Sequence, residues 1–233
     1  MVAVTALGVL AAPAWAGLCQ APFMHDGGQT TLVGSGAVRL GADLAFTNVS
    51  HQGQDQCEAR VQGTASYGLA GLPSGKSTLD YWMTVHNGNA VFHRQDDQGK
   101  RQPVQGKFDL RMLGLFAYGE PIRKAGQTFP ALRFQINVDR KAVQADPIVV
   151  NTSQKTVGDK QSMDTAAGSQ SCWPIRYVRT IAPTKATFNG IVLPIPGMTA
   201  DVTDWFCPDL NMVMKQESNQ SGVVSVMEVS KLN

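Results

Sequence analysis

Residues 80–93 read DYWMTVHNGNAVFH, and they show the clearest structural pattern in the chain. Two runs rich in β-forming residues flank Asn87-Gly88, a pair that supplies the two positive-φ positions of a type I′ turn. The stretch therefore predicts a β-hairpin in which Val85 pairs with Ala90 and Met83 with Phe92. Alternation along the two strands then predicts a core-facing side made of Tyr81, Met83, Val85, Ala90 and Phe92.

Other segments of the chain have the same character. They are short, alternating or β-branched, and bounded by Gly, Pro, Asn, Asp or Ser, which predicts strands at residues 107–116, 131–138, 148–155, 173–181, 185–193, 211–216 and 223–231. No segment has a sustained helical stripe, so we expect little helix, at most one turn near 110–116 or 203–206. The predicted fold class is all-β, an antiparallel sheet rolled into a barrel or half-barrel, with a β-sandwich as the alternative.

The N-terminal segment predicts export. Residues 1–24 carry no charge, and the apolar run at 7–16 ends in Ala14-Trp15-Ala16, a small-x-small pattern typical of signal-peptidase sites. The run is shorter than the roughly 20 apolar residues that a membrane span needs. We therefore expect residues 1–16 to be a removed signal peptide and the mature protein to be periplasmic and not membrane-spanning.

The rest of the chain, residues 17–233, is expected to form a single β-rich domain, and any subdivision would fall near 120–157. Lipidation of Cys19 is not expected, because Leu18 occupies the position where a bacterial lipoprotein has a small residue.

The charge pattern argues against two classes of partner. Lys and Arg number 20, Asp and Glu number 18, and like charges form no run. A nucleic-acid groove or an anionic membrane surface would call for a basic cluster, so neither is expected as a partner.

Four cysteines in an exported chain predict two disulfides, for which the sequence allows three pairings. We favour Cys19 with Cys57 and Cys172 with Cys207, because each pair lies within one half of the chain. A zinc site is disfavoured, since structural zinc sites usually draw ligands from closely spaced cysteine pairs.

The four histidines do not form a recognisable site. In the predicted hairpin His86 and His93 share a face but lie roughly 13 Å apart, too far for one metal ion. Neither of these two lies near a matching Ser, Cys or acidic motif, and His25 and His51 are the only other candidates for a base or a nitrogen ligand. No catalytic residue, metal or cofactor is therefore predicted.

Three glycine- or aspartate-rich stretches are predicted to be turns. Residues 96–99, DDQG, resemble a fragment of a calcium loop but lack its later ligands and closing Glu, so a hairpin tip is expected. Residues 34–36 and 71–76 lack the strand-to-helix setting of a phosphate loop. Ser35 also lacks the spacing of a serine nucleophile elbow.

The C-terminal third carries a further pattern, in VGDK (157–160), TAAGSQSCWPIRY (165–177) and DWFCPDLNMVMK (204–215). These stretches resemble a family of uncharacterised exported bacterial β-rich proteins, a domain of unknown function, in which a T-P-A-G-T-F strand precedes a W-Y-x-P-x-x-G-x-V-K strand. This chain departs from the pattern at Ala166, Phe206 and Asn211, where Pro, Tyr and Gly are usual. The resemblance implies an exported β scaffold and transfers no catalytic residue.

The same residues predict local structure. Gly168 is expected in a turn before a strand, Pro208 in a second turn, and Asn211 in a left-handed conformation. Trp205 and Cys207 alternate on one strand, so Trp205 is expected to point inward and to be buried. All are interpreted as structural residues.

Two functional hypotheses follow. The first is non-catalytic binding of an apolar or lipid-like ligand on the concave face of the rolled sheet. The alternative is a structural or interaction protein that docks on another cell-envelope component through loops and strand edges. An enclosed apolar pocket would favour the first, and a filled core the second.

Overall fold

The structure is a computed structural model that describes residues 17–36, 38–53, 56–69, 75–86, 89–96, 98–103, 118, 120–136, 139–140, 143–188 and 191–233. These residues form nineteen strands and two short 3-10 helices, η1 (Leu18–Gln20) and η3 (Pro208–Leu210). The prediction of an all-β fold with little helix is confirmed. The expected signal peptide, the strand at 107–116, the turn at 87–88 and the first four residues of the turn predicted at 71–76 lie outside the described residues, while Gly75 and Lys76 begin a strand.

The N-terminal half is an antiparallel meander in which each strand pairs with the next. Its strands are β1 (Gln29–Ser35), β2 (Val38–His51), β3 (Gln56–Leu69), β4 (Gly75–His86), β5 (Asn89–Gln95) and β6 (Arg101–Pro103). Between β4 and β5, Met83 pairs with Phe92 and Val85 with Ala90, which confirms the predicted register. The tip between β5 and β6 is the predicted turn, where Asp96 Oδ1 accepts hydrogen bonds from the backbone N–H groups of Gln98 and Lys100.

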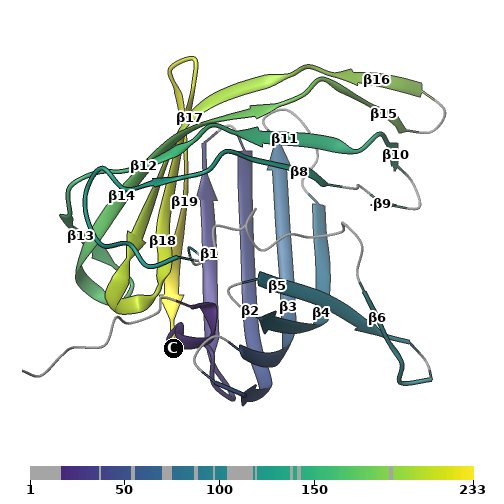
Figure 1. Ribbon diagram of the computed structural model, residues 1–233. Helices are drawn as coiled ribbons and strands as arrows, with labels where there is room; N and C mark the ends of the chain where they lie inside the picture. The colour runs from purple at the N-terminus through teal and green to yellow at the C-terminus, as the bar shows by residue number, and fades with distance from the viewer. Residues whose placement is uncertain are drawn as a thin grey trace, which may run out of the picture.

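The C-terminal half continues the same sheet. Its strands are β7 (Thr128–Phe129), β8 (Leu132–Ile136), β11 (Ile148–Thr152), β12 (Lys155–Val157), β13 (Gln161–Thr165), β14 (Gly168–Ile181), β17 (Met198–Cys207), β18 (Met212–Gln220) and β19 (Val223–Leu232). Antiparallel pairing of β19 with β1 joins the two halves into one 15-stranded sheet. In the described residues its main path runs β6-β5-β4-β3-β2-β1-β19-β18-β17-β14-β11-β8 and stays open, and Figure 1 shows it curling as a half-barrel.

A second sheet of four strands extends from the upper edge in Figure 1. It contains β9 (Asp139–Arg140), β10 (Val143–Ala145), β15 (Thr184–Phe188) and β16 (Ile191–Ile195). The single strand predicted at 185–193 is therefore wrong, because Phe188 pairs with Ile191 across a hairpin. The sequence does contain the signal for this hairpin, a second Asn-Gly pair at 189–190.

The helical turn expected at 203–206 is also wrong. These residues lie within β17, where Thr203, Asp204 and Phe206 pair with β14 and β18. Pairing with strands on both sides gives the backbone its hydrogen bonds in an extended form, which overrides any local helical tendency.

The main core lies on one face of the rolled sheet. Across β2, β3 and β4, Phe46 pairs with Val61, and Val61 with Tyr81, and all three side chains are buried. The predicted core face of the β4–β5 hairpin is confirmed, with Met83 and Val85 at most 1% exposed. The residues that alternate with this apolar face on β2 and β3 are exposed or half-buried, so the apolar face is the one that the curled sheet encloses, its concave side.

Two disulfides fasten the sheet. Cys19 of η1 is bonded to Cys57 of β3, and Cys172 of β14 to Cys207 of β17, which are the pairs that sequence order favoured. Disulfides are typical of oxidising compartments, so they indicate an extracytoplasmic location. Among the described residues, no helix has the length and apolar character to cross a membrane.

Gly63 gives the first testable prediction, because its neighbour strand comes very close. A Cβ at this position would overlap the backbone carbonyl oxygen of Asp43 on β2. Gly63→Ala should therefore push the two strands apart and lower the free energy of unfolding by about 1–3 kcal/mol. Denaturant unfolding measures this loss. Ser66→Ala, an exposed change on the same strand, is the control and should stay within about 0.5 kcal/mol of wild type.

Candidate functional site

Asp204 is the most unusual residue on the concave side, since it is a carboxylic acid with no exposed surface. It lies on β17 between Val202 and Phe206, which are buried as well. Met227 of β19 is buried on the core-facing side and pairs with Gln216 of β18. Gln216 pairs with Asp204, and Asp204 pairs with Ile175 of β14, so these side chains lie on the same side of the sheet. Asp204 therefore points to the same side of the sheet as the main core.

Three hydrogen-bond donors surround the Asp204 carboxyl group. The Tyr118 hydroxyl donates to Oδ2 at 2.6 Å, and the Gln216 amide donates to Oδ1 at 2.8 Å. The Tyr177 hydroxyl, from β14, donates to Oδ1 at 3.3 Å. Both oxygens are thus satisfied, as a buried carboxyl group requires.

A lysine completes this cluster. Lys155 begins β12, is 7% exposed, and places its Nζ 3.8 Å from Asp204 Oδ2. The same ammonium group lies 4.3 Å from the centre of the Tyr177 ring and 5.0 Å from that of Tyr118, within cation–π range. We call Asp204, Lys155, Tyr118, Tyr177 and Gln216 the Asp204 network.

Burial dominates the electrostatics of the Asp204 network. It raises the pKa of Asp204 above the ordinary carboxyl value, although Lys155 and the hydroxyl of Tyr118 act in the opposite direction. Burial and the nearby Asp204 also raise the pKa values of the Tyr118 and Tyr177 hydroxyls. Both tyrosines therefore remain protonated hydrogen-bond donors at neutral pH.

Arg179 connects the Asp204 network to the less buried part of the concave side. It follows Tyr177 by two residues on β14, so its side chain points to the same face. Its Nη1 donates to Gln216 Oε1 at 3.1 Å, while Gln216 in turn donates to Asp204. Arg179 is half-buried, whereas Asp204 is fully enclosed.

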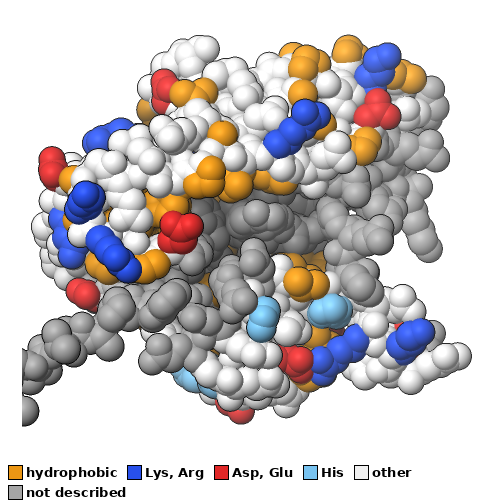
Figure 2. Space-filling model, in the orientation of Figure 1, with side chains coloured by type: hydrophobic (Ala, Val, Ile, Leu, Met, Phe, Trp, Pro, Cys, Tyr) orange, Lys and Arg blue, Asp and Glu red, His pale blue; other side chains and the backbone are white. Residues whose placement is uncertain are grey.

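Apolar side chains lie beside Arg179 on this face. Val150, Ile181 and Met198 form one row across β11, β14 and β17, and Leu132 belongs to the neighbouring row that contains Arg179. We call Leu132, Val150, Ile181 and Met198 the apolar patch. Val150 is buried, Ile181 and Met198 are half-buried, and Leu132 is 44% exposed. In Figure 2 several hydrophobic side chains lie side by side along the lower edge of the upper part of the molecule.

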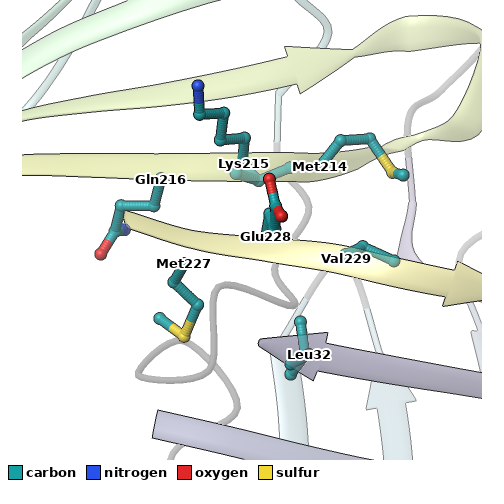
Figure 3. Close-up of a pocket in the computed structure, with 8 residues that line it drawn as sticks. Leu32, Met214, Lys215, Gln216, Met227, Glu228 and Val229 are labelled. Carbon is teal, nitrogen blue, oxygen red and sulfur yellow. The ribbon is translucent and has the colours of Figure 1, made fainter. Parts of the chain in front are cut away.

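A small hollow lies between β18, β19 and β1, as Figure 3 shows, and does not suit a ligand. Its lining includes Leu32, Met214 and Met227, and it has no room for a molecule as large as water. We therefore treat it as a packing feature of the core.

The residues interpreted from the sequence as structural have such roles where the structure describes them. Gly168 has φ +87° in the turn between β13 and β14, where Thr165 Oγ1 accepts a hydrogen bond from the Ala167 N–H. Pro208 begins η3, and Asn211 ends it with φ +53°, the left-handed conformation that was expected.

Trp205 requires a correction, because it is half-buried and not buried as expected. The alternation of Trp205 with Cys207 along β17 holds, since the extra residue at the β17–β18 register shift is Met214 of β18, but the side of β17 that carries Trp205 is only partly covered. Trp205 still packs against the main core, but its indole N–H is enclosed and has no hydrogen-bond partner among the described residues.

None of the histidines belongs to the Asp204 network. His25 Nδ1 contacts the carbonyl of Asp26, and His51 Nε2 contacts the carbonyl of Met24 at 3.1 Å. His86 pairs with Asn89, and His93 with Trp82, as the hairpin predicts. In the part of the chain that the structure describes, no group of three or more His, Cys, Asp or Glu side chains is arranged to hold a metal ion.

Comparison with known proteins gives structural likenesses only. No protein-family model and no curated protein sequence matches the chain. Three solved structures match it at low identity, and nothing about their roles is transferred to this chain at this level of likeness.

The first is a candidate exported protein with a YmcC-like fold from Bacteroides fragilis, 11% identical, with a TM-score of 0.48 over 91% of this chain and 99% of that one. The second is a candidate lipoprotein from Parabacteroides distasonis, 12% identical, with a TM-score of 0.49 over 92% and 99% of the two chains. The third is the hypothetical lipoprotein YmcC from Escherichia coli, 10% identical, with a TM-score of 0.34 over 87% and 84%.

Proposed function

We propose that this protein acts in the periplasm as a non-catalytic binding protein for an apolar or lipid-like ligand, held on the concave face of the half-barrel. The observation that carries the proposal is the apolar patch. Its residues come from four neighbouring strands, share the core-facing side of the sheet, and include half-buried Ile181 and Met198. Partly buried apolar surface on a concave face is the usual lining of a ligand site.

The Asp204 network supports a binding role over a catalytic one. Asp204 has no exposed surface, and both of its oxygens already accept hydrogen bonds from protein donors. A catalytic acid or base must come within hydrogen-bond reach of its substrate, which this enclosed carboxyl group does not. The network is better suited to holding β12, β14, β17 and β18 in fixed positions.

A second candidate function is docking on another envelope component. It is favoured by the exposed valines at the start of β19, where Val223 and Val224 are each 53% exposed. Two adjacent exposed valines are a small surface compared with the patches that usually mark interaction sites. We therefore rank docking second.

A neutral apolar probe tests the proposed function. The mature chain, residues 17–233, should give a saturable rise in the fluorescence of N-phenyl-1-naphthylamine, and 1-dodecanol should reverse it. Met198→Asp should weaken probe binding at least about tenfold, because a carboxylate beside the bound probe would lose hydration. Val224→Asp, an exposed change elsewhere, should leave binding unchanged. Absence of saturable binding to wild type, or equal losses in both variants, would overturn the proposal.

A further inference from the structure

Arg179 has binding capacity that the protein itself does not use. A guanidinium group carries five N–H donors, and in the described residues that of Arg179 makes one hydrogen bond, to the neutral Gln216 side chain. No carboxylate of the described residues forms an ion pair with it. The nearby buried acid, Asp204, forms its ion pair with Lys155, and Arg179 acts on it only through its charge, which helps to lower the pKa of Asp204.

The guanidinium is also held in place. Arg179 Nη1 donates a 3.1 Å hydrogen bond to Gln216 Oε1. The amide group of the same Gln216 is fixed by the 2.8 Å hydrogen bond that it donates to Asp204. This chain of contacts leads from a fully buried carboxyl group to a half-buried cation. A positioned cation loses less conformational entropy when it binds an anion, so the arrangement is preorganised for one.

The acidic residues nearest in register point away from Arg179. Asp201 pairs with Val178, and Glu217 pairs with Thr203, positions that alternate with the core-facing residues of β14 and β17. Glu217 forms an ion pair with Lys215 on the face of the sheet opposite to Arg179. The positive charge of Arg179 is therefore not balanced by these carboxylates.

The apolar patch adjoins this cation. Arg179 lies in one row with Thr152 and Leu132, and Ile181 is two residues further along β14 on the same face. A ligand that contacted both Arg179 and the apolar patch would need an anionic group next to an apolar chain.

We propose that Arg179 binds the anionic headgroup of a lipid whose acyl chain lies on the apolar patch. This inference rests on the proposed function and narrows the ligand to anionic amphiphiles. The guanidinium would donate two parallel hydrogen bonds to the headgroup oxygens, the geometry that arginine favours with carboxylates and phosphates.

Paired ligands of equal chain length test the inference. Calorimetry with laurate and with 1-dodecanol, at about pH 8 where the carboxylate is ionised, separates the headgroup from the chain. Wild type should bind laurate at least about tenfold more tightly than 1-dodecanol, as expected for hydrogen bonds to a charged group. Arg179→Gln should remove this preference while keeping 1-dodecanol binding, and Arg179→Lys should retain part of it.

Arg176→Gln provides the matched control, because Arg176 is an exposed arginine on the opposite face of β14. It should leave both affinities unchanged. The headgroup assignment would be overturned if wild type bound the two ligands equally. It would also be overturned if Arg179→Gln kept the laurate preference at an unchanged denaturation midpoint. Either result would leave the proposed function intact. Failure of wild type to bind either ligand would overturn both.

Discussion

Replacement of Asp204 by alanine is expected to lower the free energy of unfolding by about 3–5 kcal/mol, because it removes one partner of a buried ion pair. Lys155, at 7% exposure, would lose its ion pair with Asp204 in a buried setting. Tyr118 and Gln216 would lose the acceptor for their hydrogen bonds at the same time. Denaturant unfolding at neutral pH measures the loss, which is a large share of the stability of a single domain.

Two further variants show whether the loss comes from the Asp204 network. Asp201→Ala removes an exposed carboxylate from the same strand and should change stability by no more than about 0.5 kcal/mol. Asp204→Asn keeps one acceptor oxygen and should lose less than Asp204→Ala. If Asp204→Ala were as stable as wild type, the network would not stabilise the junction of β12, β14, β17 and β18.

Removal of the Cys172–Cys207 disulfide should have an effect of similar size. The bond joins β14 to β17 and closes a loop with a sequence separation of 35 residues. The chain-entropy account gives about 3–4 kcal/mol for such a loop, so the double variant Cys172→Ala, Cys207→Ala should show a clearly lower unfolding midpoint. Both cysteines are fully buried, and the loss of their packing adds to this effect.

The matching change in the other disulfide is the comparison. Cys19 and Cys57 are 38 residues apart, so Cys19→Ala, Cys57→Ala should cost about the same through loop entropy. Non-reducing peptide mapping of wild type should recover both linked pairs. A Cys19–Cys207 link would contradict the arrangement described above.

Local patterns in the sequence were sufficient for most of the strands. The Asn87-Gly88 pair and the alternation around it predicted the register of β4 and β5 correctly, since hairpin pairing depends on residues close in sequence. The same rule would have found the β15–β16 hairpin at 189–190. The pairing of β1 with β19 joins the two ends of the domain, and no local pattern specifies it.

The candidate site was harder to predict for the same reason. Tyr118 and Asp204 are 86 residues apart in sequence, and only the folded sheet brings them within hydrogen-bond distance. One local signal was present, because Asp204 occupies an inward position between the apolar residues Val202 and Phe206. An acid at such a position needs partners, but the sequence does not identify Lys155, Tyr118 or Gln216 as those partners.

Native mass spectrometry of the protein, purified without detergent from its own cells, tests the central claim most directly. Ligand binding on the concave face predicts a folded chain that carries a reproducible small-molecule adduct. Collisional activation should release this adduct, and solvent extraction should recover it as an anionic lipid. A bare chain at the mass of the disulfide-bonded polypeptide, whether alone or with a co-purifying protein, would contradict the account.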